Sequence, residues 1–143
     1  YKNFRGIGGI SRAIFNGENS INLITHKINE HFDHGTPYTL TKIKLKPNQS
    51  KESSNSLVQK VTLKNLRKLL IDIDKAKYNF FDSSIKFNWS KKLYLSSDLD
   101  KARNVKFSKI KNLDQMKRII LALIYDGRKI KLEINNNNYI ISK

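Results

Sequence analysis

The chain has 143 residues, and its 28 Lys and Arg against 12 Asp and Glu give a formal net charge of +16. This length fits one domain with a modest core, because 38% of the residues are hydrophobic. The lack of cysteine excludes disulfides and thiolate zinc sites, and no apolar run is long enough to predict a membrane span. We therefore expect a single basic domain over residues 1–143.

Residues 1–19 are predicted to form a flexible lead-in, with at most a short turn of helix. Four glycines punctuate this segment, at Gly6, Gly8, Gly9 and Gly17. Their spacing does not match a dinucleotide-binding loop or a phosphate-binding P-loop, and no strand is predicted before them. The glycines therefore indicate a loop and no specific ligand.

Residues 20–34, "SINLITHKINEHFDH", are interpreted as a helix. Ser20 can cap its start and Gly35 can end it. Apolar residues recur at helical spacing, namely Ile21, Ile24, Ile28 and Phe32. All three histidines of the chain, His26, His31 and His34, would then lie on this helix.

Residues 38–46, "YTLTKIKLK", alternate as a strand and are followed by a polar loop over 47–56. The motif "LKNL" at 63–66 then returns as "IKNL" at 110–113, and each copy opens an apolar helical run. Two strands are expected after each helical run, and one shorter strand is expected before it. The expected strands are 57–61, 85–89 and 92–96 in the first unit, and 105–107, 129–134 and 139–142 in the second, with the turn-forming "NNNN" between the last two.

These patterns predict an α+β fold in which helices pack on one face of an antiparallel sheet. A duplicated β-α-β-β unit after an N-terminal helix is one interpretation. Two helix-hairpin units that arose independently are the other. Strand alternation places Trp89 and Leu132 in the core and Lys86 and Lys131 on the surface.

The outward face of the predicted sheet is strongly basic, which favours binding of a polyanion, RNA before DNA. Lysines would contact phosphates, as would Arg5 in the lead-in, and tyrosines would stack on bases. The predicted nucleic-acid-binding residues are Arg5, Tyr38, Lys42, Lys44, Lys46, Lys86, Lys92, Tyr94, Lys129 and Lys131. The alternative is an ordinary solvated sheet face, on which lysines discourage edge pairing.

The histidines suggest a metal-independent ribonuclease, with His31 or His34 as its acid or base, so both are candidate catalytic residues. On the predicted helix His31 borders the apolar stripe, His34 lies in the last turn, and His26 faces solvent. Three ordinary surface histidines are the alternative. No metal or cofactor is expected, because His26 and His34 would be about 12 Å apart along the helix, at 1.5 Å per residue, and could not share an ion.

The basic charge, the lack of cysteine and the order of helix and then sheet resemble the small nuclease domains at the C-termini of bacterial toxins. That resemblance implies a toxin-type ribonuclease and an acidic inhibitor or immunity-type protein as a second partner. A non-catalytic RNA- or DNA-binding domain and a basic module for an acidic protein surface are the alternatives. The expected place of action is the cytoplasm, with export as part of a larger chain left open.

Overall fold

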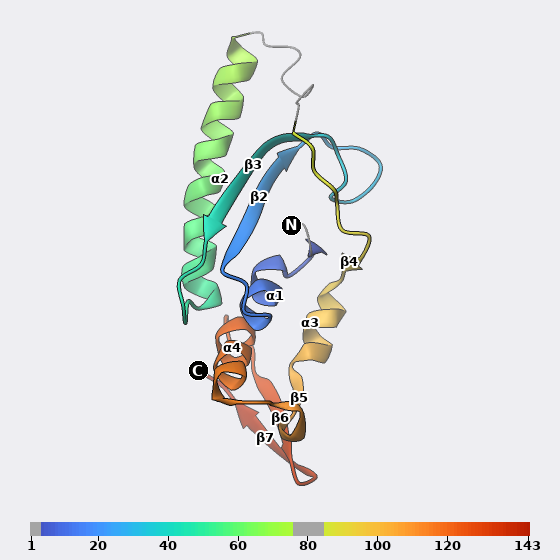
Figure 1. Cartoon of the computed structure of the whole chain (residues 1–143), viewed down its shortest axis with the longest axis vertical. Coiled ribbons are helices and arrows are strands. Elements are labelled where there is room, and N and C mark those ends of the chain that lie inside the picture. Colours follow the sequence, from blue (N-terminus) through green and yellow to red (C-terminus); the bar gives the residue numbers. More distant parts are fainter. Residues whose placement is uncertain (1–3, 76–84) are drawn as a thin grey trace.

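The fold was established from a computed structural model, which describes residues 4–75 and 85–143 (Figure 1). Its helices and strands are mixed along the chain. In chain order they are β1 (Arg5–Gly6), α1 (Gly9–Phe15), β2 (Ser20–His26), β3 (Pro37–Lys44), α2 (Lys51–Asp74), β4 (Leu93–Tyr94), α3 (Ser96–Ala102), β5 (Asn104–Lys106), the 3-10 turn η1 (Phe107–Lys109), α4 (Leu113–Leu123), β6 (Ile130–Ile134) and β7 (Asn137–Ile141). The predicted α+β class is confirmed.

The segment predicted as a helix over 20–34 is a strand followed by a loop. β2 pairs antiparallel with β3, in a register that sets Ile21 opposite Ile43, and both side chains are buried. Ile21 and Leu23 fit the alternation of a strand as well as Ile21 and Ile24 fit the spacing of a helix. Pairing with β3 therefore decides that this segment is a strand. Ile28, which the helix interpretation buried, is 87% exposed in the loop.

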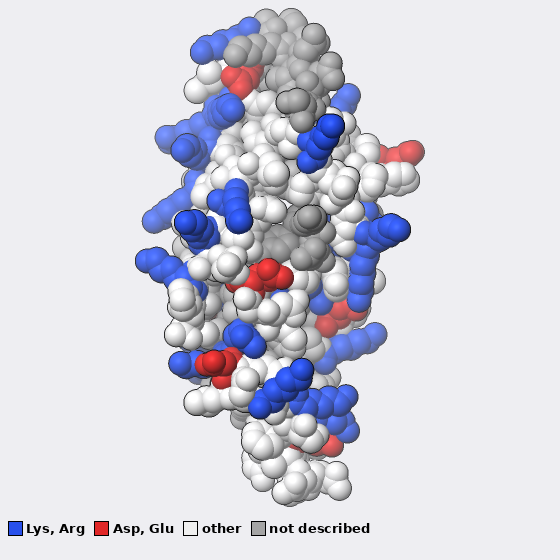
Figure 2. All heavy atoms as spheres, viewed as in Figure 1, with Lys and Arg blue, Asp and Glu red and all other residues white. Residues whose placement is uncertain are grey.

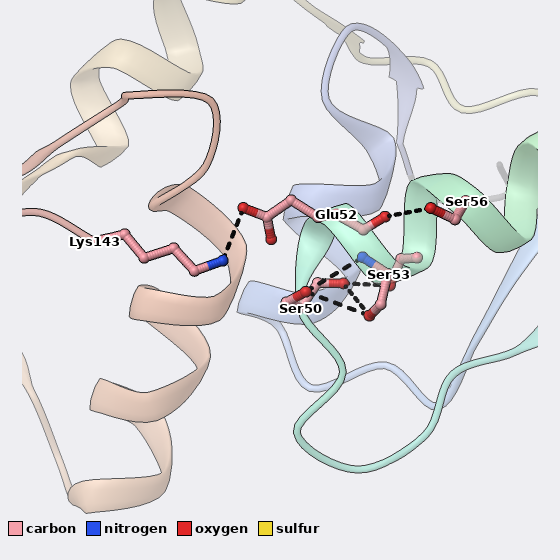
Figure 3. Close-up of polar contacts among 6 residues, drawn as sticks. Ser50, Glu52, Ser53, Ser56 and Lys143 are labelled. Atoms are coloured by element: carbon pink, nitrogen blue, oxygen red, sulfur yellow. Dashed lines mark hydrogen bonds and ion pairs between the residues drawn. The ribbon is translucent and has the colours of Figure 1, made fainter.

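α2 begins inside the predicted polar loop and also replaces the strand expected at 57–61. Ser50 caps this helix, since its side-chain oxygen accepts the backbone N–H of Ser53 at 3.2 Å (Figure 3). Glu52 in the first turn pairs with Lys143 at 3.2 Å and so joins the helix to the end of the chain. The helix then runs alongside the β2–β3 hairpin (Figure 1).

The C-terminal part follows the sequence prediction closely. α4 begins after Asn112, which caps it, and β6 and β7 form the expected hairpin. Asn135 and Asn136 form its turn with φ of 49° and 65°, a left-handed conformation that asparagine tolerates better than most residues. Leu132 is buried and Lys131 is exposed, as the strand alternation predicted.

The first copy of the proposed repeat does not form the helix and β-hairpin that the C-terminal part forms. Residues 85–89 form no strand, although Lys86 is exposed and Trp89 half-buried. β4 is two residues long and pairs in parallel with β1. The described strands form three small sheets, β1–β4, β2–β3 and β5–β6–β7, instead of one antiparallel sheet. The interpretation as a duplicated unit is therefore wrong.

The core lies where α1, α4 and β6 meet, below the β2–β3 hairpin (Figure 1). Ala13 of α1, Leu123 of α4 and Ile130 of β6 are between 0% and 1% exposed. α1 itself lies within residues 1–19, where a flexible lead-in was predicted. Among the helices of the described residues, none is long and apolar enough to cross a membrane.

Candidate functional site

The three histidines lie at the end of β2 and in the loop that follows it, and not on a helix. His26 is the last residue of β2, whereas His31 and His34 lie in the loop over residues 27–36 and are exposed. His26, which the sequence interpretation placed in solvent, is instead half-buried, with 21% of its side chain exposed. The structure therefore reverses the expectation for two of them: His26 is the half-buried histidine, and His31 is exposed to solvent.

The loop is held in one conformation by contacts to other parts of the chain. The backbone N–H of Gly6 in β1 donates to Asp33 Oδ2 at 3.0 Å, and the indole N–H of Trp89 donates to the Gly35 carbonyl at 3.2 Å. A Cβ at Gly35 would lie 1.5 Å from the Lys27 carbonyl oxygen, so only glycine fits there. These contacts fix the position of Asp33, whose φ is 47°.

His26 and Asp33 form a pair at the centre of this arrangement. The Nδ1 of His26 lies 2.9 Å from the Lys27 carbonyl oxygen, and a carbonyl only accepts, so Nδ1 must carry a proton. The other ring nitrogen, Nε2, lies 4.0 Å from Asp33 Oδ1. Because its Oδ2 is occupied by the Gly6 amide, Asp33 presents Oδ1 toward His26. Both groups belong to the types that take part in general acid–base catalysis.

This pair lines a cavity of about 220 Å³. Its lining combines a few polar side chains with a larger number of apolar ones. The polar residues are Arg5, Asn22, His26 and Asp33, and the apolar residues include Phe4, Ile10, Ile21, Leu23, Ile24 and Val58. A mostly apolar cavity with few convergent polar groups is the usual form of a small-molecule site.

Trp89 forms an aromatic wall of the same cavity. Its ring contacts His26 edge-on at 5.1 Å and Phe87 edge-on at 5.0 Å, and the His34 ring stacks against it at 6.4 Å. It is the single tryptophan of the chain, so the tryptophan fluorescence of the protein comes from a residue that lines this cavity.

The lysines predicted to bind nucleic acid are exposed, but they do not gather at this cavity. Figure 2 shows basic side chains along α2 and also over the other parts of the visible face. Lys42, Lys44 and Lys46 are on or just after β3, Lys86 and Lys92 lie between α2 and β4, and Lys129 and Lys131 lie at β6. Arg5 is the one member of the predicted set that lines the cavity.

The two tyrosines expected to stack on bases are not presented for stacking. Tyr38 is buried, and its hydroxyl donates to the Asp72 carboxylate of α2. Burial, followed by this hydrogen bond, raises the pKa of Tyr38 to about 12. Tyr94 is half-buried, and the Arg12 guanidinium covers its ring at 4.0 Å.

No family model and no curated protein matches this sequence. Solved structures do match it. A 4-N formyltransferase from Francisella tularensis aligns with a TM-score of 0.80 at 17% identity, over 99% of this chain and 57% of that one. The fold is that of the formyltransferases.

Two further formyltransferases have the same fold. A sugar N-formyltransferase from Shewanella sp. has a TM-score of 0.73 at 15% identity, over 99% of this chain and 56% of that one. An N-formyltransferase from Helicobacter canadensis, in complex with folinic acid and dTDP-3-aminofucose, has a TM-score of 0.72 at 17% identity, over 96% of this chain and 49% of that one. The chain spans about half the length of these formyltransferases.

The formyltransferase likeness contradicts the function expected from composition. The prediction of a toxin-type ribonuclease, or of a nucleic-acid-binding domain, is wrong. A charge of +16 raises the affinity of a surface for polyanions in general, but it does not specify the chemistry of a cavity. The predicted partners and cellular location stay predictions.

The sequence analysis drew attention to "HKINEHFDH", and two of its side chains, His26 and Asp33, line the cavity; neither was predicted to do so. Asp33 was treated as a helix residue between histidines, His26 as solvated, and Trp89 only as core. The available signal was the Asp33–Gly35 spacing shortly before the strand β3, which is typical of a tight turn. Within the described residues, no group of three or more His, Asp or Glu is arranged to hold a metal ion.

Proposed function

We propose that this chain forms part of the catalytic centre of an N-formyltransferase, in which Asp33 takes a proton from the amine that receives the formyl group. The observation that carries the proposal is the position of Asp33. It is fixed by the Gly6 amide and lies beside His26 at a cavity, in a chain with the formyltransferase fold.

Formyl transfer to an amine requires a base at one defined point. The amine nitrogen attacks the formyl carbon, a C–N bond forms, and the carbonyl electron pair moves onto oxygen. The attacking nitrogen then loses a proton. The oxygen electron pair returns as the bond to the donor nitrogen breaks, and the donor nitrogen leaves with a proton.

Asp33 is suited to the proton-accepting role because half of its side chain is exposed at the cavity and no backbone N–H of residues 4–75 or 85–143 donates to its Oδ1. His26 lies behind it, with its Nδ1 proton committed to the Lys27 carbonyl. We assign His26 as a positioning residue, because its Nε2 lies 4.0 Å from Asp33 Oδ1 and favours the ionised carboxylate whenever the imidazole is charged.

The donor and acceptor classes come from the structural neighbours. The Helicobacter canadensis enzyme was captured with folinic acid and dTDP-3-aminofucose, so a formylated folate and a nucleotide-linked amino sugar are the first compounds to test.

The test compares Asp33→Asn with Asp126→Asn. Both aspartates are exposed and both have positive φ, of 47° and 50°, but Asp126 lies in the turn after α4. Formation of the formamide product is followed by mass spectrometry, and binding of folinic acid by Trp89 fluorescence. Asp33→Asn should slow product formation about 10²–10⁴-fold, the usual cost of losing a positioned base, while folinic acid still binds. Asp126→Asn should be neutral. Equal rates for the two variants would overturn the role of Asp33.

A further inference from the structure

A second hollow, of about 400 Å³, lies at the opposite end of the β2–β3 hairpin from Asp33. It forms where the turn over residues 17–19, before β2, and the turn over residues 45–49, after β3, meet α4. β2 runs from Ser20, beside the hollow, to His26, beside the cavity, which is about 20 Å at 3.4 Å per residue. Of the described residues, none lines both the hollow and the cavity, so the hollow is a separate site.

Arg118 of α4 lines this hollow with its guanidinium unpaired. Its Nε is buried without a hydrogen-bond partner, and within residues 4–75 and 85–143 no carboxylate forms an ion pair with it. The guanidinium lies over Gly17, where a Cβ would be 2.9 Å from Nη1, so the glycine leaves the space that the guanidinium takes. A guanidinium packed at its base keeps its outer N–H groups for a ligand, and a carboxylate matches their planar fork.

The hollow also carries charges of the opposite sign. Glu18 and Asp114 line it together with Lys46 and Arg118, so two carboxylates balance two cations in a chain whose net charge is +16. Asp114 and Arg118 are four residues apart on α4 and therefore lie on the same face of the helix, but within the described part of the chain they do not pair with each other. Unpaired charges of both signs at one hollow suit a ligand that carries both charges.

Apolar side chains make up much of the remaining lining. Ile14 of α1 and Leu45, directly after β3, are buried, with 7% and 9% of each residue exposed. Leu121 of α4 adds a half-buried side chain. The hollow therefore offers an apolar surface next to its charged groups, which suits a ligand with an aliphatic part.

The two turns that border the hollow are fixed by hydrogen bonds. The backbone N–H of Leu45 donates to the Asn19 carbonyl at 2.9 Å and so ties the two turns together. The backbone N–H of Lys46 donates to Gln49 Oε1 at 2.8 Å, which closes the second turn. A hollow whose borders are already held in place binds a ligand without a large cost of ordering them.

We infer that this hollow binds a free amino acid with an apolar side chain. The carboxylate of the ligand accepts hydrogen bonds from Arg118, its ammonium group pairs with Asp114, and its side chain contacts Leu45 and Leu121. A plain anion such as phosphate would meet Asp114 as a like charge, and a plain amine would meet Arg118. Only a zwitterion is matched at both ends, and the site is independent of formyl transfer at Asp33.

The test measures binding to the whole chain by isothermal titration calorimetry at fixed ionic strength. The four probes are L-leucine, N-acetyl-L-leucine, L-leucinamide and inorganic phosphate. N-acetyl-L-leucine lacks the ammonium charge, L-leucinamide lacks the carboxylate, and phosphate lacks both the ammonium charge and the aliphatic part. L-leucine should bind at least tenfold more tightly than each of the other three, because each of them loses one charged contact.

Variants of α4 assign the binding to the hollow. Arg118→Gln should weaken L-leucine binding about tenfold or more, and Arg118→Lys should weaken it less, since it keeps the charge but not the fork. Asp114→Asn, at an exposed position, should weaken it about three- to tenfold. Lys117→Gln is the matched control, because it removes an exposed charge from the same helix without lining the hollow, and it should leave binding unchanged.

Equal binding of L-leucine and N-acetyl-L-leucine would make the hollow an anion site only, and equal binding of L-leucine and L-leucinamide would make it a cation site only. Either result would overturn the inference, as would equal losses for Arg118→Gln and Lys117→Gln. Formamide formation by the Arg118 and Asp114 variants should stay at the wild-type rate, because neither residue lines the cavity at Asp33. The two sites are therefore tested separately, and failure of one leaves the other standing.

Discussion

Gly6 is the residue through which the backbone of β1 fixes Asp33, and Gly6→Ala tests that arrangement. Gly6 has φ of 94°, and a Cβ there would lie 2.4 Å from the Tyr94 carbonyl oxygen. That oxygen would have to move by about 1 Å to reach the 3.4 Å at which ordinary contact begins. It also accepts the Ile7 N–H at 2.9 Å, so the movement would break the link between β1 and β4.

The expected cost has three parts. A positive φ costs a residue with a Cβ about 1–2 kcal/mol. The broken backbone hydrogen bond adds about 0.5–1.5 kcal/mol, and the displaced amide of Gly6 weakens a hydrogen bond to a carboxylate, which is worth about 1.5–3 kcal/mol. Because the Asp33 side chain is half exposed, we take the low end of the last value. The total reduction in the free energy of unfolding is then about 3–5 kcal/mol, a large part of the usual stability of a domain.

Gly127→Ala is the matched control, since Gly127 has φ of 69° but a Cβ there would meet nothing within 4 Å. It should cost only the conformational part, about 1–2 kcal/mol. Urea unfolding followed by Trp89 fluorescence measures both variants. Equal losses of stability would mean that β1 and β4 separate at little cost, and that Gly6 does not hold Asp33 through a fixed backbone.

Two further predictions concern the core and the buried tyrosine. Leu123→Ala, at a 1% exposed position of α4, should lower the free energy of unfolding by about 2–5 kcal/mol, whereas Leu113→Ala, 78% exposed on the same helix, should change it by less than about 0.5 kcal/mol; similar values in thermal or urea unfolding would contradict the assigned core. Because the pKa of Tyr38 is raised to about 12, its contribution to stability should be complete below pH 10 and should be lost between about pH 10 and 12. Absorbance titration of wild type against Tyr38→Phe isolates this group, and a Tyr38 midpoint near pH 10 would mean that its hydroxyl is not buried.

The sequence by itself determined the C-terminal part of the fold, because the signals there are local. Lys131 and Leu132 alternate across one strand, and the asparagines that follow adopt the left-handed conformations of a tight turn whatever packs around them. The helix at Leu113–Leu123 likewise has one continuous apolar stripe and a capping Asn112. In each case neighbouring residues carry all the information needed.

Only the tertiary structure decided the N-terminal part and the candidate site. The run from Ile21 to Ile28 fits a helix and a strand almost equally, and β3 selects the strand by pairing with it. Once β2 ends at His26, the loop brings Asp33 back toward it, and the amide that fixes Asp33 belongs to Gly6, 27 residues earlier in the chain. Trp89, which closes the same cavity, comes 54 residues after the Gly35 carbonyl that it contacts. Such long-range contacts leave no local period in the sequence, since they depend on where separate elements meet in space.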